Sequence, residues 1–185
     1  MIETNLAETS LVFATRIGWI GVRFCGDSVT RTTMGHRVKR QAAKAIGTTA
    51  PQALALTPCQ RDIVERLQRF AEGEATNFDD VCVSLANVTK FQRSVLNHCR
   101  TLRWGETASY GTIARWVGHP GAARAVGSTM AKNPAPIIIP CHRVVSAAGL
   151  GGFSAPGGCR TKQALLDAES NSYNFEDKTV GCGRI

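Results

Sequence analysis

The chain of 185 residues is long enough for one large domain or two small ones. Hydrophobic residues make up 43% of it, and no apolar run approaches the length of a membrane span, so we expect no membrane-spanning helix. Seven cysteines at irregular spacings, with no CxxC pair, argue against a disulfide framework and a zinc finger. We therefore expect a reducing compartment, the cytoplasm or nucleoid, or the nucleus of a eukaryote, and the acidic opening MIETNLAETS predicts no secretory signal.

The net charge of +8 is unevenly distributed along the chain. Residues 1–87 hold ten Lys and Arg against nine Asp and Glu, whereas residues 88–162 hold ten against a single acid, Glu106. This asymmetry favours a polyanionic partner for the second half, most simply a nucleic acid. Composition alone leaves a generically basic protein as the alternative.

Residues 1–87 are expected to form a small α/β support domain without a catalytic constellation. β-Forming residues divided by turns predict an antiparallel meander over 11–34. The Ala-rich stretch that follows has helix potential, and such a basic run is more often a solvated face than a DNA contact; its cations are Arg37, Lys39, Arg40 and Lys44. The sequence TPCQ at 57–60 has the pattern of a capping box and predicts a helix over 58–72.

The second half begins with an amphipathic helix after Thr89 and continues with a helix-turn-helix pattern. Ser109 is a suitable N-cap for a short helix, residues 118–121 read as a tight glycine turn, and residues 122–132 as a second helix rich in small residues. Such a thin helix can approach a nucleic acid closely, with Arg124 as the one long cation among the small residues. An ordinary packed helical hairpin is the alternative, and the local charge favours nucleic acid. A last helix is expected over 161–169, with a polar tail after it.

The stretch IIIPCHRVV at 137–145 places a cysteine, a histidine and an arginine directly after an apolar run. Its β-branched residues and neighbouring prolines predict a short buried strand rather than a helix. A thiol beside an imidazole and a guanidinium is favoured as the thiolate, so Cys141 is a candidate nucleophile. A packed core cysteine is the alternative, because free cysteine is among the most buried residue types.

Four blocks together carry a resemblance to a known family: GETASYG at 105–111, AARAVG at 122–127, MAKNP at 130–134 and IPCHRV at 139–144. In this order and spacing they resemble the O6-alkylguanine-DNA alkyltransferases, or methylated-DNA–protein-cysteine methyltransferases. The match runs without gaps from about Phe91 to Val145 and more loosely to Glu169.

This resemblance implies an α+β fold. We expect an N-terminal small antiparallel-sheet (ribonuclease H-like) domain over 1–87 and a mainly helical, winged-helix-like domain over 88–170, which binds DNA and carries the active site, with a polar tail over 171–185. The family flips an alkylated base out of the duplex and transfers the alkyl group irreversibly to a cysteine, here Cys141. The implied partner is double-stranded DNA carrying O6-methylguanine or O4-methylthymine, bound through the minor groove by a monomer, with no cofactor, no metal and no membrane.

The resemblance also implies roles for single residues. His142 would take the thiol proton through a water, with Glu169 orienting it, while Tyr110 would donate a hydrogen bond to the leaving base. Asn133 would be a hinge whose side chain satisfies backbone groups. Arg124 would fill the place of the flipped base. The implied DNA contacts are Ser109, Tyr110, Ala123, Arg124, Gly127 and Arg143, and the implied base pocket is Met130, Val144, Val145, Phe153 and Ser154.

Several positions depart from the family pattern. Residues 88–92 read VTKFQ where many members have GTPFQ, and Trp104, placed near the DNA face, stands where Tyr is common. Phe153 replaces a frequent Tyr, and Ala155 and Pro156 lengthen the loop. Cys25 and His36 do not reproduce the zinc ligands that some members have. The rival interpretations are a lesion-binding protein that does not transfer the group, a helix-turn-helix regulator and a Cys-His hydrolase.

Overall fold

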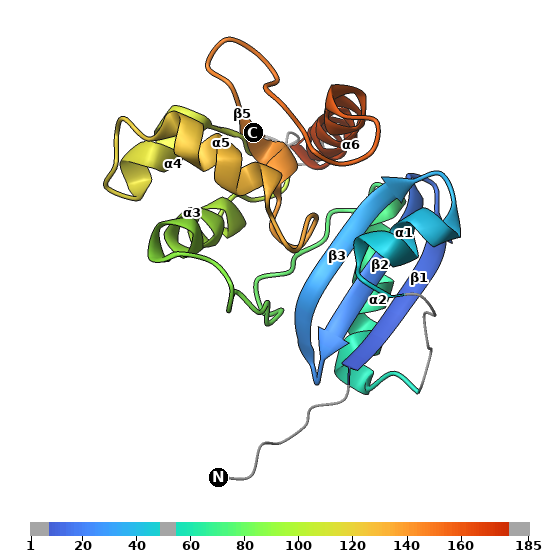
Figure 1. Cartoon of the computed structure of the whole chain (residues 1–185). Helices are drawn as coiled ribbons and strands as arrows, with labels where there is room; N and C mark the ends of the chain where they lie inside the picture. The colour runs from blue at the N-terminus through green and yellow to red at the C-terminus, as the bar shows by residue number, and fades with distance from the viewer. Residues whose placement is uncertain (1–7, 49–54, 178–185) are drawn as a thin grey trace, which may run out of the picture.

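The computed structural model describes residues 8–48 and 55–177 of the chain. The N-terminal part is a three-stranded sheet with two helices, and the C-terminal part is mainly helical, which confirms the expected α+β fold (Figure 1). Within the described residues, no helix is both long and apolar enough to cross a membrane.

The N-terminal sheet is the predicted antiparallel meander. Its strands β1 (Glu8–Thr15), β2 (Gly18–Cys25) and β3 (Ser28–His36) lie in the order β1-β2-β3. Alternation along β2 turns Ile20, Val22 and Phe24 toward one face, where they are fully buried. Gly21 points to the opposite face, where a side chain would approach Ile46 to 3.1 Å.

Two helices cover the two faces of this sheet. Helix α1 (Lys39–Ala45) packs its buried Ala42 and Ala43 near Val12. Helix α2 (Pro58–Ala71) packs against the other face through an apolar stripe of Ile63, Val64, Leu67 and Phe70. The predicted capping box at the start of α2 is present, with the Gln60 backbone N–H donating to Thr57 Oγ1 at 3.1 Å.

The C-terminal part is built from helices around the predicted helix-turn-helix. Helix α3 (Lys90–Arg100) is followed by β4 (Ala108–Ser109), α4 (Tyr110–Trp116) and α5 (Ala123–Ala131). A 3-10 turn η1 (Cys141–Arg143) leads to β5 (Val144–Val145), which pairs with β4 in parallel, and then to α6 (Cys159–Asp177).

The predicted N-cap Ser109 is present, and Thr89 is a second N-cap that the sequence reasoning did not name. Thr89 forms a complete capping box with Gln92, so VTKFQ still begins a helix. Ser109 accepts the backbone N–H of Thr112 at 3.0 Å. The last helix departs from expectation: it starts at Cys159 and continues to Asp177, so the predicted end at Glu169 is too early and the first residues of the expected tail are helical.

The apolar run Ile137–Ile139 is buried but is a turn, not the predicted strand. Pro134, Pro136 and Pro140 lack backbone N–H groups and cannot donate to a sheet ladder. The Ile139 N–H instead donates to the Ala135 carbonyl at 2.8 Å, closing a tight loop that leads into η1.

Segments far apart in sequence cover the outer edge of β3. Val29 exchanges backbone hydrogen bonds with residues 82–84, and the Thr32 N–H donates to the Pro134 carbonyl at 2.9 Å. The edge strand is therefore closed partly by the C-terminal part of the molecule.

Candidate active site

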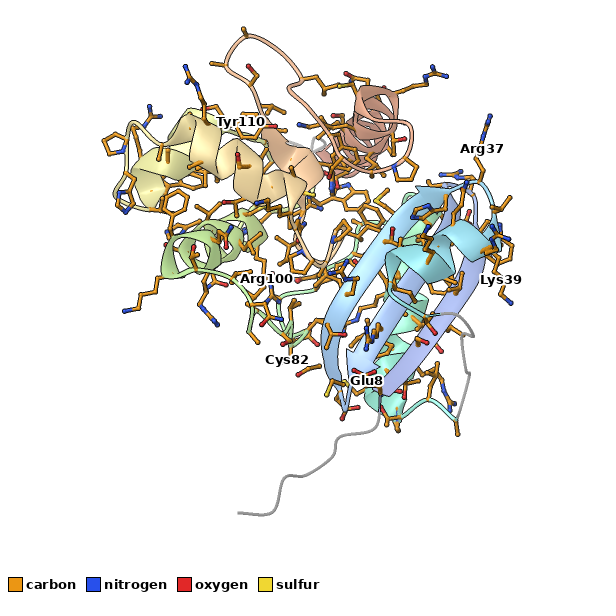
Figure 2. All side chains as sticks on the ribbon, viewed as in Figure 1. Glu8, Arg37, Lys39, Cys82, Arg100 and Tyr110 are labelled. Carbon is orange, nitrogen blue, oxygen red and sulfur yellow. The ribbon has the colours of Figure 1, made fainter. Side chains whose placement is uncertain are left out.

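A cavity of about 480 Å³ lies between α4, α5, η1 and the loop before α6. Tyr110, labelled in Figure 2, comes from the start of α4 and lies between the helices and this loop. The lining residues are Tyr110, Arg124, Gly127, Met130, Ala131, Cys141, Gly152, Phe153 and Ser154. Seven of these nine are residues that the family resemblance had implied for the site.

Gly151 makes room for the Tyr110 ring. A Cβ on Gly151 would lie 2.9 Å from the ring and 3.0 Å from its hydroxyl, and the φ of +72° at this position also favours glycine. A Cβ on Gly127 would lie 3.8 Å from the ring, an ordinary contact distance, so the ring does not require glycine at that position. Burial raises the pKa of Tyr110, so its hydroxyl stays protonated at neutral pH and remains a hydrogen-bond donor.

Cys141 lies at the inner end of this cavity with only 5% of its surface exposed. Burial raises the pKa of its thiol, although the Asn133 amide and the Lys162 ammonium act in the opposite direction. The expectation that the neighbours of Cys141 favour the thiolate is therefore wrong. Desolvation raises the pKa of the thiol more than the neighbouring groups lower it, so the resting form is the thiol.

His142 is fully buried behind the cysteine and paired with Glu169. Its Nε2 lies 2.8 Å from Glu169 Oε1, as the proposed orienting role requires. Burial lowers the pKa of His142 more than Glu169 raises it, so the imidazole is neutral at neutral pH. A neutral ring facing a carboxylate carries its proton on Nε2, which leaves a lone pair on Nδ1. Nδ1 is buried and has no hydrogen-bond partner among the described residues.

Arg143 faces away from the cavity, and the prediction that it binds DNA is wrong. Its guanidinium is 6% exposed and donates to both Glu169 oxygens at 2.9–3.1 Å and to the Leu102 carbonyl at 2.7 Å. Burial acts to raise the pKa of Glu169, but the hydrogen bonds from His142 and Arg143 outweigh it and lower that pKa. The carboxylate is therefore ionised, and Arg143 neutralises it.

Aromatic residues from both parts of the molecule enclose this ion pair. The ring of Phe70, at the end of α2, packs edge-on against His142 with centroids 5.8 Å apart and against Trp104 at 5.6 Å. Trp104 Nε1 donates to the Glu169 backbone carbonyl at 3.1 Å. Trp104 is only partly buried where its ring packs against this cluster, so its expected position near the DNA face stays a prediction.

Lys162 is a site residue that the sequence reasoning missed. It is fully buried on α6, and its Nζ donates to the Val144 carbonyl at 2.6 Å and the Gly152 carbonyl at 3.3 Å. Lysine is rarely buried, so residue type gave no warning. Its spacing from Leu165 and Glu169 could have revealed it, since the three residues share one helix face.

The remaining predicted residues divide into those that reach the cavity and those that do not. Asn133 satisfies backbone groups as expected, donating to the Ile139 carbonyl at 2.8 Å and accepting the Ala135 N–H at 3.0 Å. Val144 and Val145 were expected in the pocket but are not among its lining residues, because they pair with β4. Ser109 caps α4 and Ala123 begins α5, so their DNA contacts stay predictions.

Comparisons with known proteins agree with this architecture. The family model described as the DNA-binding domain of 6-O-methylguanine DNA methyltransferase matches residues 90–171. The chain is 47% identical over 109 residues to the methylated-DNA–protein-cysteine methyltransferase of Mycobacterium tuberculosis, covering 58% of this chain and 64% of that protein. It is 42% identical over 113 residues to the protein of the same name from Methanosarcina acetivorans, covering 60% and 69%.

The similarity to solved structures extends over most of the chain. The crystal structure of Mycobacterium tuberculosis O6-methylguanine methyltransferase aligns with a TM-score of 0.72 at 36% identity, covering 89% of this chain and 94% of that one. The structure of Mycobacterium tuberculosis OGT in complex with DNA gives 0.69 at 35% identity, covering 88% and 93%. The sequence alignment spans slightly less than two thirds of the mycobacterial relative, whereas the structural alignment spans nearly all of it.

The matched proteins are named as a class of methyltransferases in which a cysteine of the protein accepts a methyl group from methylated DNA. The chain belongs to the O6-methylguanine-DNA methyltransferase family.

Proposed function

We propose that this protein repairs DNA by direct damage reversal, transferring the methyl group of O6-methylguanine to the sulfur of Cys141. The observation that carries the proposal is the thiol at the inner end of a cavity, next to the buried His142–Glu169 pair. A neutral imidazole oriented by a carboxylate is the arrangement that activates a nucleophile.

The transfer would begin with loss of the thiol proton. His142 Nδ1 accepts it, through one bridging water, and Glu169 and Arg143 hold the imidazole in place meanwhile. The raised pKa of the thiol makes the resulting thiolate a strong nucleophile, because nucleophilicity rises with thiol pKa. The buried thiolate also lacks the hydration that would stabilise it.

Bond exchange would then take place at the methyl carbon. Sγ of Cys141 forms a bond to this carbon as the bond from carbon to O6 breaks, and the released electron pair passes to the guanine. Tyr110 donates a hydrogen bond to the developing negative charge, and the proton held by His142 returns to the base through solvent. The products are guanine and S-methylcysteine, and because a thioether does not readily give up its methyl group, we propose that each molecule reacts once.

The base must leave the duplex to reach a thiol at the inner end of a cavity, which costs a few kcal/mol, a typical value for flipping. Arg124, exposed on α5 at the cavity, would fill the vacated place in the stack from the minor groove, with the protein acting as a monomer. O4-methylthymine carries the same alkyl group on an exocyclic ring oxygen, so we propose it as a second substrate.

One assay tests this function. Wild-type protein is incubated with duplexes carrying O6-methylguanine or O4-methylthymine, and intact mass with peptide mapping follows the product. We expect one added methyl on Cys141, limited to one equivalent per protein, and none on Cys141→Ala, which should still bind the duplex. Binding without a mass change would instead support a lesion-binding protein or a regulator.

A further inference from the structure

The loop that leads to Cys141 is held by the N-terminal sheet at one residue, Thr32 of β3. The Thr32 backbone N–H donates to the Pro134 carbonyl at 2.9 Å, and its hydroxyl donates to the Pro136 carbonyl at 2.6 Å. Thr32 is 3% exposed, so these bonds are shielded from water. One residue of the support domain thus makes two hydrogen bonds to the segment five to seven positions before the thiol.

The same loop contains a strained residue. Ile137 has a φ of +77°, the only positive value at a non-glycine position within the described residues. A β-branched side chain in this region is a genuine outlier and persists only where the surroundings impose it. Ile137 is 2% exposed and lies directly after the Pro136 carbonyl that Thr32 binds, so Thr32 is placed to impose this conformation.

A chain of hydrogen bonds connects this loop to the thiol. The Ile139 N–H donates to the Ala135 carbonyl, and the Ile139 carbonyl accepts both the Asn133 side chain and the Cys141 N–H, each at 2.8 Å. The backbone position of Cys141 therefore depends on the loop geometry. Asn133 holds the loop from within the C-terminal part, and Thr32 holds it from the N-terminal sheet.

We propose that Thr32 is a positioning residue for alkyl transfer: its hydroxyl fixes the strained loop and thereby the place of the Cys141 sulfur at the inner end of the cavity. This assigns the N-terminal domain a part in the chemical step rather than in DNA binding. The inference rests on the proposed function, because it concerns the rate of that reaction. Thr32 touches neither the thiol nor the cavity and acts through the loop.

The test uses three variants of the full chain. Thr32→Val keeps the shape and the backbone bond and removes the hydroxyl, whereas Thr32→Ser keeps the hydroxyl. Thr30→Val is the matched control on the same strand, because the Thr30 hydroxyl donates to the Arg23 carbonyl at 3.1 Å within the sheet. Each variant is measured for melting temperature, for Kd with unmodified duplex and for the first-order rate of methyl transfer at saturating duplex.

We expect Thr32→Val to slow transfer about fivefold, the factor that corresponds to one typical hydrogen bond. Its Kd for duplex should stay within about twofold of wild type, and Thr32→Ser should restore most of the rate. Thr30→Val should lower the melting temperature without slowing transfer. Equal transfer rates for Thr32→Val and wild type would overturn the proposal. So would equal slowing in Thr30→Val, which would indicate a purely structural effect.

A second readout does not depend on the repair reaction. The rate at which iodoacetamide modifies Cys141, followed by peptide mapping across a range of pH, reports how the thiol is presented. We expect Thr32→Val to change this pH profile and Thr30→Val to leave it as in wild type. If wild type fails to take up methyl from either duplex, the proposed function is wrong, while the iodoacetamide profiles still decide whether Thr32 positions the thiol. Identical profiles in all variants would contradict the positioning role.

Discussion

The two ends of the η1 turn lie in opposite surroundings, although they are only two residues apart. Cys141 borders a cavity with thin glycine and alanine walls and an exposed cation, Arg124. Arg143 lies in a closed cluster in which nearly every polar group is paired, centred on the Glu169 carboxylate. His142 stands between them, with one nitrogen on the carboxylate and the other without a partner among the described residues.

This difference assigns DNA binding to the cavity side of η1 and activation of the thiol to the cluster side. Under the proposed function, a base enters and leaves the cavity, so the cavity side must exchange its contents. The cluster side is built to stay fixed, because a buried charge without its partner is costly. Substitutions on the cluster side should therefore reduce stability, and substitutions on the cavity side should reduce affinity while leaving stability unchanged. The predictions below test this separation, from the largest expected effect to the smallest.

Glu169→Gln should disrupt the cluster side most strongly. The change leaves the Arg143 guanidinium buried without a counter-charge, which typically costs about 3–5 kcal/mol of unfolding free energy. Urea unfolding at neutral pH measures the loss. Glu106→Gln is the matched control: Glu106 is exposed and accepts only the Arg103 backbone N–H among the hydrogen bonds of the described residues, so its cost should stay within about 0.5 kcal/mol. Equal losses of unfolding free energy for the two variants would contradict a stabilising role of the Glu169–Arg143 ion pair.

Acid should weaken the same cluster in two stages. The pKa of His142 is lower in the folded chain than in the unfolded chain. Below about pH 6.5 the unfolded chain therefore binds a proton that the folded chain does not bind, and the free energy of unfolding falls. The folded pKa of Glu169 is also lowered, so its contribution is present above about pH 4.3 and is lost as the pH falls through the folded value. A tenfold difference in proton affinity between the folded and unfolded chain corresponds to about 1.4 kcal/mol of stability. Urea unfolding from pH 7 to pH 3 should show both stages.

The Glu169→Gln variant provides the control for this pH dependence. Without the carboxyl group the lower stage should disappear, while the loss that begins near pH 6.5, typical of histidine, should remain. A variant whose stability falls as steeply as that of wild type below about pH 4.3 would show that other carboxylates cause the acid loss.

Arg124→Ala tests the cavity side. The side chain is exposed and makes no ion pair with a described residue, so the melting temperature should not change. Affinity for duplex should fall several-fold. If Arg124 neutralises a phosphate, the slope of log affinity against log salt should also become shallower by about one. Arg69→Ala removes a cation of α2 that pairs with Glu74, and it should leave both the affinity and the slope as in wild type.

Local patterns predicted the elements well because their causes are local. The predicted capping box at Thr57 and the predicted N-cap at Ser109 each depend on a residue three positions away, and the alternation along β2 depends on its own pleat. The family motifs likewise led to Cys141, His142 and Glu169, and the structure brings His142 and Glu169 into contact.

The errors arose where distant residues decide the structure. The Ile137–Ile139 run resembles a strand by composition, but its turn is held by Thr32, about a hundred positions earlier in the chain. From the sequence, Arg143 resembles a surface cation. It is buried because it pairs with Glu169, which lies 26 positions later in the chain. The spacing of Lys162 on α6 indicated the buried helix face, but its acceptors are backbone carbonyls of distant residues, which residue types do not indicate.

The closed edge of β3 has a consequence for how the chain folds. The Thr32–Pro136 hydrogen bond joins residues 104 positions apart, so it closes a very long loop and can form only after much of the chain has been synthesised. Until then the outer edge of the sheet stays partly unpaired and open to association with other chains. We therefore expect the first 87 residues alone to aggregate, and the complete chain to unfold in a single cooperative transition.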